Sequence, residues 1–397
     1  MSRIVPPLLD MMRTLIAQPS VSSARPALDM SNVAVLTHLQ SWLDDLGFRT
    51  ELQALTDDPA KANLIATLGS GPGGLVLAGH TDTVPWDEGR WQVDPFAGQI
   101  RNERLYGLGS ADMKSFLAMA VEAAGRFADT PLREPLIILA TADEECSMMG
   151  ARHLAAQGRP RARAAVVGEP TGLRPVRMHK GIMMERIVLR GLSGHSSNPA
   201  LGRNALDGMH RVMGALMQLR EDFAQRYREP AFSVPQPTLN LGHIHGGDNP
   251  NRICAECELH FDLRLLPGME IDEMRALLAR TAHEAIAGSG LEVEYMPLFD
   301  GVAAMSTPAG SALVAAVEKL TGFSAGAVDF GTEGPFYRSM GMDTVILGPG
   351  SIDQAHQPDE FLELAQVEPT VSLLESLIHR FCADPGSAPA TQEKPEA

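Results

Sequence analysis

The sequence lacks a long apolar run, an excess of basic charge and a dense set of cysteines. No stretch of the 397 residues approaches the roughly 18 apolar residues of a membrane-spanning helix, and the N-terminus has no signal-peptide core. The formal net charge of −16 argues against nucleic acid, because phosphate binding needs a basic face. We therefore predict neither a membrane partner nor a nucleic-acid partner.

The four cysteines (Cys146, Cys254, Cys257 and Cys382) are too few for a disulfide scaffold in a chain of this length. Cys254 and Cys257 have the spacing of a redox or zinc pair. They lie in a segment of alternating polarity, where positions three apart point to opposite sheet faces, and no second pair exists. We interpret them as two unrelated reduced thiols, which fits a cytoplasmic location.

The chain is long enough for two domains, and 44% hydrophobic with 21% charged residues is typical of a soluble globular protein. Strand-like and helix-like runs alternate to about residue 171 and again after residue 310, which predicts an α/β fold with a doubly wound, mainly parallel sheet. Helices are expected at residues 7–17, 31–46, 113–127, 147–157, 311–320 and 368–381.

Between these parts the pattern changes to the order β-α-β-β-α-β, which is typical of a compact α+β, ferredoxin-like sheet with helices on one face. We predict a catalytic domain from residues 1–180 and 299–382 and a smaller inserted domain at 181–298. Residues 383–397, rich in Pro, Ala, Ser and Glu, are predicted to form a disordered tail.

Residues of the kinds that bind metals follow five apolar, strand-like runs, within residues 79–82, 110–114, 143–145, 168–171 and 354–357. In an open α/β sheet, sites assemble beyond the carboxyl ends of the strands. Taken singly, such a His or Asp is more often a cap or turn residue. Their recurrence favours one cluster, and a mixture of imidazole and carboxylate suits zinc or a similar divalent ion. The pattern predicts a metal-dependent hydrolase.

The acidic turn Asp143-Glu144-Glu145 is the most specific of these elements. Adjacent residues leaving a strand point in different directions, so one carboxylate can bind a metal while its neighbour faces the substrate. Such a free carboxylate could take the proton of a metal-activated water. The alternative is a solvated acidic turn that opens a helix at Ser147.

Two further side chains allow more than one interpretation. Asp82 lies two residues beyond His80 and could orient its imidazole, or it could be a turn aspartate before Val84-Pro85. His195 lies in a glycine-flanked loop of the inserted segment, where a surface histidine is more common than a catalytic one.

Residues 79–85, 109–114, 143–145 and 168–171 resemble the signature of the co-catalytic zinc amidohydrolases. That family includes aminoacylase, carboxypeptidase G and succinyl-diaminopimelate desuccinylase. Residues 239–248, 251–254, 266–269 and 347–360 resemble its branch that deacetylates N2-acetyl-L-ornithine. The resemblance extends from the first helix to about Cys382 and departs from that pattern at residues 331–335, where related sequences can carry Cys and Ala in place of glycines.

The resemblance implies two divalent metal ions, with zinc first and cobalt or manganese as alternatives. His80 and Glu169 would hold one ion and Glu145 and His356 the other, with Asp112 bridging both.

It also implies roles around the metals. Glu144 would be the general base and Asp82 the carboxylate behind His80. The inserted domain would act as a lid and pair two subunits into a homodimer. His195 would then reach the partner's site and stabilise the oxyanion, while Asn251 and Arg264 would contact the substrate.

The expected reaction is hydrolysis of the small molecule N2-acetyl-L-ornithine to L-ornithine and acetate, in arginine biosynthesis. A broader N-acyl-amino-acid deacylase and a succinyl-diaminopimelate desuccinylase are alternatives, although no added basic motif announces a site for a succinyl carboxylate. A catalytically dead, metal-stabilised binding protein is the non-enzyme alternative, and the presence of Glu144 argues against it.

Overall fold

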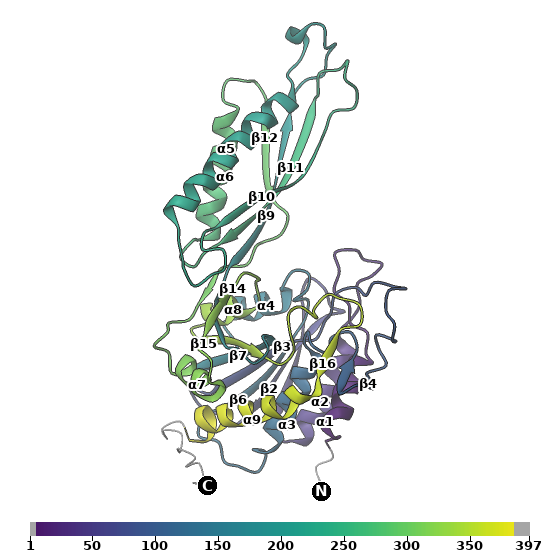
Figure 1. Cartoon of the computed structure of the whole chain (residues 1–397), viewed down its shortest axis with the longest axis vertical. Coiled ribbons are helices and arrows are strands. Elements are labelled where there is room, and N and C mark those ends of the chain that lie inside the picture. The colour runs from purple at the N-terminus through teal and green to yellow at the C-terminus, as the bar shows by residue number, and fades with distance from the viewer. Residues whose placement is uncertain (1–4, 385–397) are drawn as a thin grey trace. The chain divides into compact units, whose positions relative to one another are not determined.

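The computed structural model describes residues 5–384, which divide into two compact units (Figure 1). The second unit comprises residues 178–306 and 327–331, and the first comprises the remainder. The sequence placed the insertion at 181–298 and gave no sign of the later return of five residues. Of the predicted disordered tail, all but residues 383 and 384 lies outside the described residues.

The first unit is built on a mixed sheet. The strands that lie wholly in the first unit are β1 (Arg49–Ala54), β2 (Ala62–Leu68), β3 (Leu75–His80), β6 (Leu136–Thr141), β7 (Ala164–Pro170) and β15 (Asp343–Gly348). The sheet also includes three short strands, partly or wholly within residues of the second unit: β8 (Val176–His179), β13 (Met305–Ser306) and β14 (Gly326–Val328). The order of the strands in the sheet is β1-β2-β6-β3-β7-β15-β8-β13, with β14 beside β8. The predicted α/β fold is confirmed, with parallel pairing in the four central strands β6, β3, β7 and β15. The flanking pairs β1–β2 and β2–β6 are antiparallel.

Helices cover the sheet of the first unit. They are α1 (Leu8–Ile16), α2 (Val33–Asp45), α3 (Lys114–Gly125), α4 (Met149–Gln157), α7 (Ala312–Thr321), α8 (Gly334–Ser339) and α9 (Val367–Ile378), with the short turns η2 (Leu364–Gln366) and η3 (His379–Ala383). Helix α3 is buried on almost every side because it packs against β3 as well as α1 and α9. A Cβ at Gly168 of β7 would lie 2.1 Å from Cγ of Phe116 in α3. Only glycine therefore lets the strand pass so close to α3 just before Glu169.

One expectation about the sheet is wrong. The run at residues 105–109 is a strand only over β5 (Arg104–Tyr106), in a separate three-stranded sheet with β4 (Gln99–Arg101) and β16 (Phe361–Glu363). Gly109, with a φ of 81°, turns the chain out of the extended conformation. Asp112 is therefore carried by a loop before α3 and not by the end of a central strand.

The second unit is a four-stranded antiparallel sheet with two helices. It contains β9 (Gly181–Arg190), the turn η1 (Pro199–Leu201), α5 (Ala205–Arg226), β10 (Thr238–Gly246), β11 (Glu256–Leu265), α6 (Ile271–Ala285) and β12 (Glu292–Pro297). The chain order β9-α5-β10-β11-α6-β12 confirms the predicted β-α-β-β-α-β arrangement, and the strands lie side by side in the order β10-β11-β9-β12. Alternate side chains of β11, such as Leu259 and Phe261, pack in a core with α5 and α6. Those between them lie on the opposite face, which the helices leave open (Figure 1).

Among residues 5–384, no helix is both long and apolar enough to cross a membrane. The four cysteines are free thiols. Cys254 precedes β11 whereas Cys257 lies within it, so the pair does not share one strand.

Candidate metal centre

The first part of the centre forms where β3 ends. His80 is buried, and its Nδ1–H donates to the backbone carbonyl of Asp82 at 3.0 Å, which fixes the ring and turns Nε2 toward two carboxylates. Nε2 lies 3.0 Å from Oδ1 of Asp112 and 4.0 Å from Oε2 of Glu169. Burial alone would lower the pKa of His80, but the Asp112 hydrogen bond and the Glu169 charge raise it well above its usual value. The position between these groups favours positive charge.

The second part lies on the other side of Asp112. Nε2 of His356 lies 3.0 Å from Oε2 of Glu145 and 3.7 Å from Oδ2 of Asp112. The hydrogen bond with Glu145 raises the pKa of His356 to about 9. Each carboxylate oxygen of Asp112 thus faces a different imidazole, which is the geometry that a ligand shared between two cations requires.

The donor set fits a pair of divalent ions. Donor atoms of His80, Asp112 and Glu145 lie within 4.8 Å of one another. Burial, and then the charge of Asp112, raise the pKa of Glu169 well above its usual value, and its Oε1 is buried without a hydrogen-bond partner in the described residues. Crowded carboxylates of this kind need cations nearby to remain ionised. The structure therefore brings together the five predicted ligands in a site of carboxylate and imidazole donors, which suits zinc.

Glu144 stands beside this set. Burial, followed by the charge of Glu169, raises the pKa of Glu144 well above that of an ordinary glutamate. A carboxylate whose proton affinity is raised in this way is suited to accept a proton during a reaction.

Asp82 makes a different contact from the one expected. Its carboxylate accepts hydrogen bonds from the backbone N–H groups of Glu144, at 3.2 Å, and Glu145, at 3.1 Å. Its Oδ1 is 3.7 Å from Nδ1 of His80, which is bonded instead to the Asp82 carbonyl. One residue thus orients the imidazole with its backbone and holds the acidic turn with its side chain.

Sequence reasoning missed Lys61, which forms an ion pair with Asp143, the first residue of the acidic turn. Its buried ammonium donates to Oδ1 of Asp143 at 2.6 Å, to Oδ1 of Asp29 at 2.7 Å and to Oγ of Ser22 at 3.0 Å. Asp143 itself has a φ of 64°, in the left-handed region that non-glycine residues seldom adopt. The ion pair fixes the residue at which the chain turns toward Glu144. A lysine just before β2 gives no sequence signal for this partnership.

Glu360 was also missed, although the resemblance motif ends on it. This side chain is 2% exposed, and its carboxylate accepts N–H groups from Gly109 at 3.1 Å, Ala111 at 2.7 Å and Asp112 at 3.1 Å. Three donors to one carboxylate stabilise the loop that presents Asp112. A glutamate before β16 could not be linked to that loop by spacing.

The other three predicted residues belong to the second unit. His195 is exposed, and its Nδ1 accepts the N–H of Ser197 at 3.2 Å, so the neutral ring carries its proton on Nε2. The N–H of Ser196 donates to the carbonyl of Asn251 at 3.1 Å, which joins the two predicted loops. Arg264 donates from Nε to Asp262 at 3.0 Å.

The fold agrees with the comparisons to known proteins. Residues 76–380 match the Peptidase family M20/M25/M40, and the chain belongs to this family. It is 49% identical over 384 residues to "Acetylornithine deacetylase" of Edwardsiella ictaluri and 47% identical over 382 residues to the protein of that name from Klebsiella pneumoniae. Each alignment covers 96% of this chain and 100% of the relative. The YXEP protein of Bacillus subtilis, described as a dinuclear metal binding peptidase from the M20 family, shares the fold, with a TM-score of 0.68, 14% identity and coverage of 94% of this chain and 96% of that chain.

Proposed function

We propose that this protein hydrolyses N2-acetyl-L-ornithine to L-ornithine and acetate with two divalent ions, of which zinc is the first choice. The observation that carries the proposal is the convergence of Asp112 with two imidazoles and two glutamates, with Glu144 beside them. The substrate follows from the two relatives with nearly half their residues in common. The free cysteines fit a cytoplasmic step of arginine biosynthesis.

The residues divide the chemistry between them. His80 and Glu169 would hold one ion, Glu145 and His356 the other, and Asp112 both. When bound, the two ions would polarise the amide carbonyl and lower the pKa of the attacking water. Glu144 takes the proton of that water as its oxygen bonds to the acetyl carbon. Glu144 then delivers the proton to the departing amine nitrogen as the C–N bond breaks, which balances the reaction.

The second unit would complete the site in a homodimer. His195 carries its proton on Nε2, as a donor to the developing oxyanion must. Its loop is bonded to the Asn251 segment, so both could meet the substrate's acetyl group together. We assign Arg264 to the substrate carboxylate, because a guanidinium pairs well with that group.

The test is a substrate panel on zinc-loaded protein. Release of acetate from N2-acetyl-L-ornithine should exceed release from acetylmethionine, and succinyl-diaminopimelate should yield little succinate. Glu144→Gln is the matched control for contaminating hydrolase. Preference for acetylmethionine would indicate the broader deacylase, and absence of hydrolysis in fully loaded protein would remove the enzymatic proposal.

A further inference from the structure

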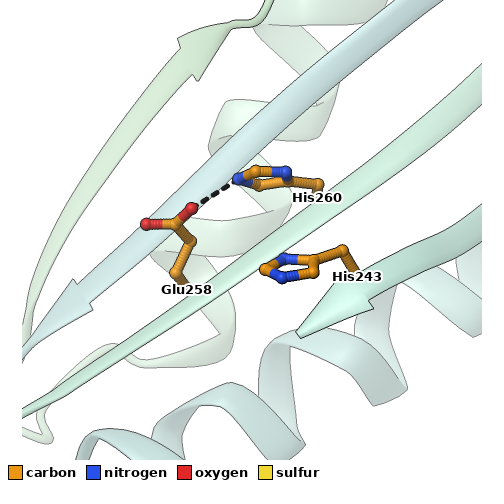
Figure 2. Close-up of side chains that lie close together, drawn as sticks. All are labelled: His243, Glu258 and His260. Carbon is orange, nitrogen blue, oxygen red and sulfur yellow. Dashed lines mark hydrogen bonds and ion pairs between the residues drawn. The ribbon is translucent and has the colours of Figure 1, made fainter. Parts of the chain in front are cut away.

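A second group of metal-type donors lies on the open face of the sheet in the second unit (Figure 2). His243 of β10 and His260 of β11 are register partners, with their ring centroids 4.8 Å apart and their planes at 38°. The register shift between Leu241 and His243 brings His243 opposite His260. Register partners point to the same face, so the two imidazoles are held side by side by the strands themselves.

Glu258 supplies a third donor. It lies two residues before His260 on β11, and thus on the same face, with Oε1 2.5 Å from Nε2 of His260. Its other oxygen, Oε2, accepts a hydrogen bond from Arg186 of β9. That bond lowers the pKa of Glu258, so the carboxylate is ionised at neutral pH. Arg186 therefore orients the carboxylate and leaves Oε1 directed at the His260 imidazole, as groups behind metal ligands commonly do.

The spacing of the three donors is close to what an ion needs. One donor atom from each residue lies within 4.8 Å of the other two. Donors at about 2.0–2.2 Å from one tetrahedral zinc are roughly 3.4 Å apart, so small side-chain rotations would close the set. His243 is exposed, and Glu258 and His260 are partly exposed, which leaves room for these rotations and for a water at the fourth position. Two histidines and one carboxylate are a known zinc ligand set.

We propose that His243, Glu258 and His260 form a further site for zinc or a similar transition-metal ion, distinct from the candidate metal centre. All three belong to the second unit, and the five ligands of the candidate metal centre belong to the first. A bound ion would replace the hydrogen bond between His260 and Glu258. It would also cross-link the edge strand β10 to β11. The guanidinium of Arg186 repels a cation, so this site binds more weakly than the carboxylate-rich centre.

The test counts zinc in the full-length protein. Metal-free protein is dialysed against zinc alone at a series of buffered free concentrations, and bound zinc per chain is measured by mass spectrometry. His243→Gln and His260→Gln should each bind one zinc fewer than the wild-type chain at high free zinc. His210→Gln removes an exposed histidine on α5 of the same unit and should bind as much as wild type.

Two further arms separate the sites. Asp112→Ala should lose zinc from the candidate metal centre and keep the zinc that His243→Gln lacks. The hydrolytic rate of His243→Gln at saturating zinc should equal that of wild type. Thermal unfolding of the metal-free proteins checks that each variant is folded. If His260→Gln is unfolded, the test relies on His243→Gln, because His243 is exposed. Equal zinc content in wild type and His243→Gln at every concentration would overturn the proposal. The cluster would then be only an ion pair between Glu258 and His260, with the ring of His243 packed beside it.

Discussion

The two donor clusters differ in how the negative charge of their carboxylates is balanced. In the candidate metal centre, buried carboxyls crowd together, and burial raises the pKa of Glu144 and Glu169. On the open sheet face, Glu258 already has a counter-ion in Arg186, and its pKa is lowered. The buried cluster thus depends on cations for charge balance, whereas the exposed cluster is balanced without them. Loss of metal should therefore disturb the first unit far more than the second.

The largest expected effect comes from Asp112, whose two oxygens face the two imidazoles. Asp112→Ala should reduce the occupancy of both ions and remove activity, whereas His356→Ala should mainly empty one site. Metal analysis of both variants, beside the hydrolytic rate, measures this difference. Two retained ions in Asp112→Ala would refute a shared ligand.

Glu144→Gln should lower the catalytic rate without lowering metal occupancy. The variant should keep both ions, because Glu144 is not among the proposed ligands, and lose about 10²–10⁴-fold in kcat, because the proposed base is gone. Acetate release and metal content are measured on one preparation. An active, fully loaded variant would exclude Glu144 as the base.

Substitution of His195 tests whether a residue of the second unit takes part in the reaction. This residue is not one of the proposed metal ligands. His195→Ala should lower kcat by about 10²–10³-fold, the usual cost of one oxyanion donor, with metal content unchanged. If the histidine crosses to a partner, mixing His195→Ala with Glu144→Gln should restore activity in hybrid dimers. If verified hybrid dimers stay inactive, His195 does not act in the active site of the partner subunit.

Lys61→Met should destabilise the first unit by about 3–5 kcal/mol, because it leaves Asp143 and Asp29 as unpaired charges in a largely buried network. The matched control is the double variant Lys61→Met/Asp143→Asn, which removes one of those charges and should recover part of the loss. Urea unfolding measures both. A loss within about 1 kcal/mol for the single variant would show that the pair contributes as little as an exposed one.

The smallest effect concerns His179, which is buried, so that its pKa falls to about 4. The unfolded chain, with a histidine pKa of about 6.5, binds the proton more readily. Stability should therefore be complete above pH of about 6.5 and decline by up to roughly 3 kcal/mol as the pH falls toward 4. The difference between wild type and His179→Gln in urea unfolding across this range isolates the effect. Parallel pH profiles would contradict it.

Much of the fold could be predicted because the central strands are continuous apolar runs and the amphipathic helices have a clear period. His80 and Glu169 were identifiable because each lies in or at the end of a central strand whose apolar run is visible in the sequence. The supporting contacts were not, because Lys61 and Asp143 are 82 positions apart and Glu360 and Asp112 are 248 apart. No local pattern links residues over such distances. The pairing of His243 with His260 depends likewise on a register shift that alternation does not reveal.

The hydrogen bonds of Asp82 have a consequence for protein engineering. Its carboxylate accepts the backbone N–H groups of both Glu144 and Glu145, which ties the position of the two residues to the segment that follows β3. A redesign that shifts Glu145 to accommodate a larger ion would also displace Glu144 from the reacting atoms. Metal preference and base position are therefore one design variable in this fold, and selection for a new metal would have to rebuild the whole turn.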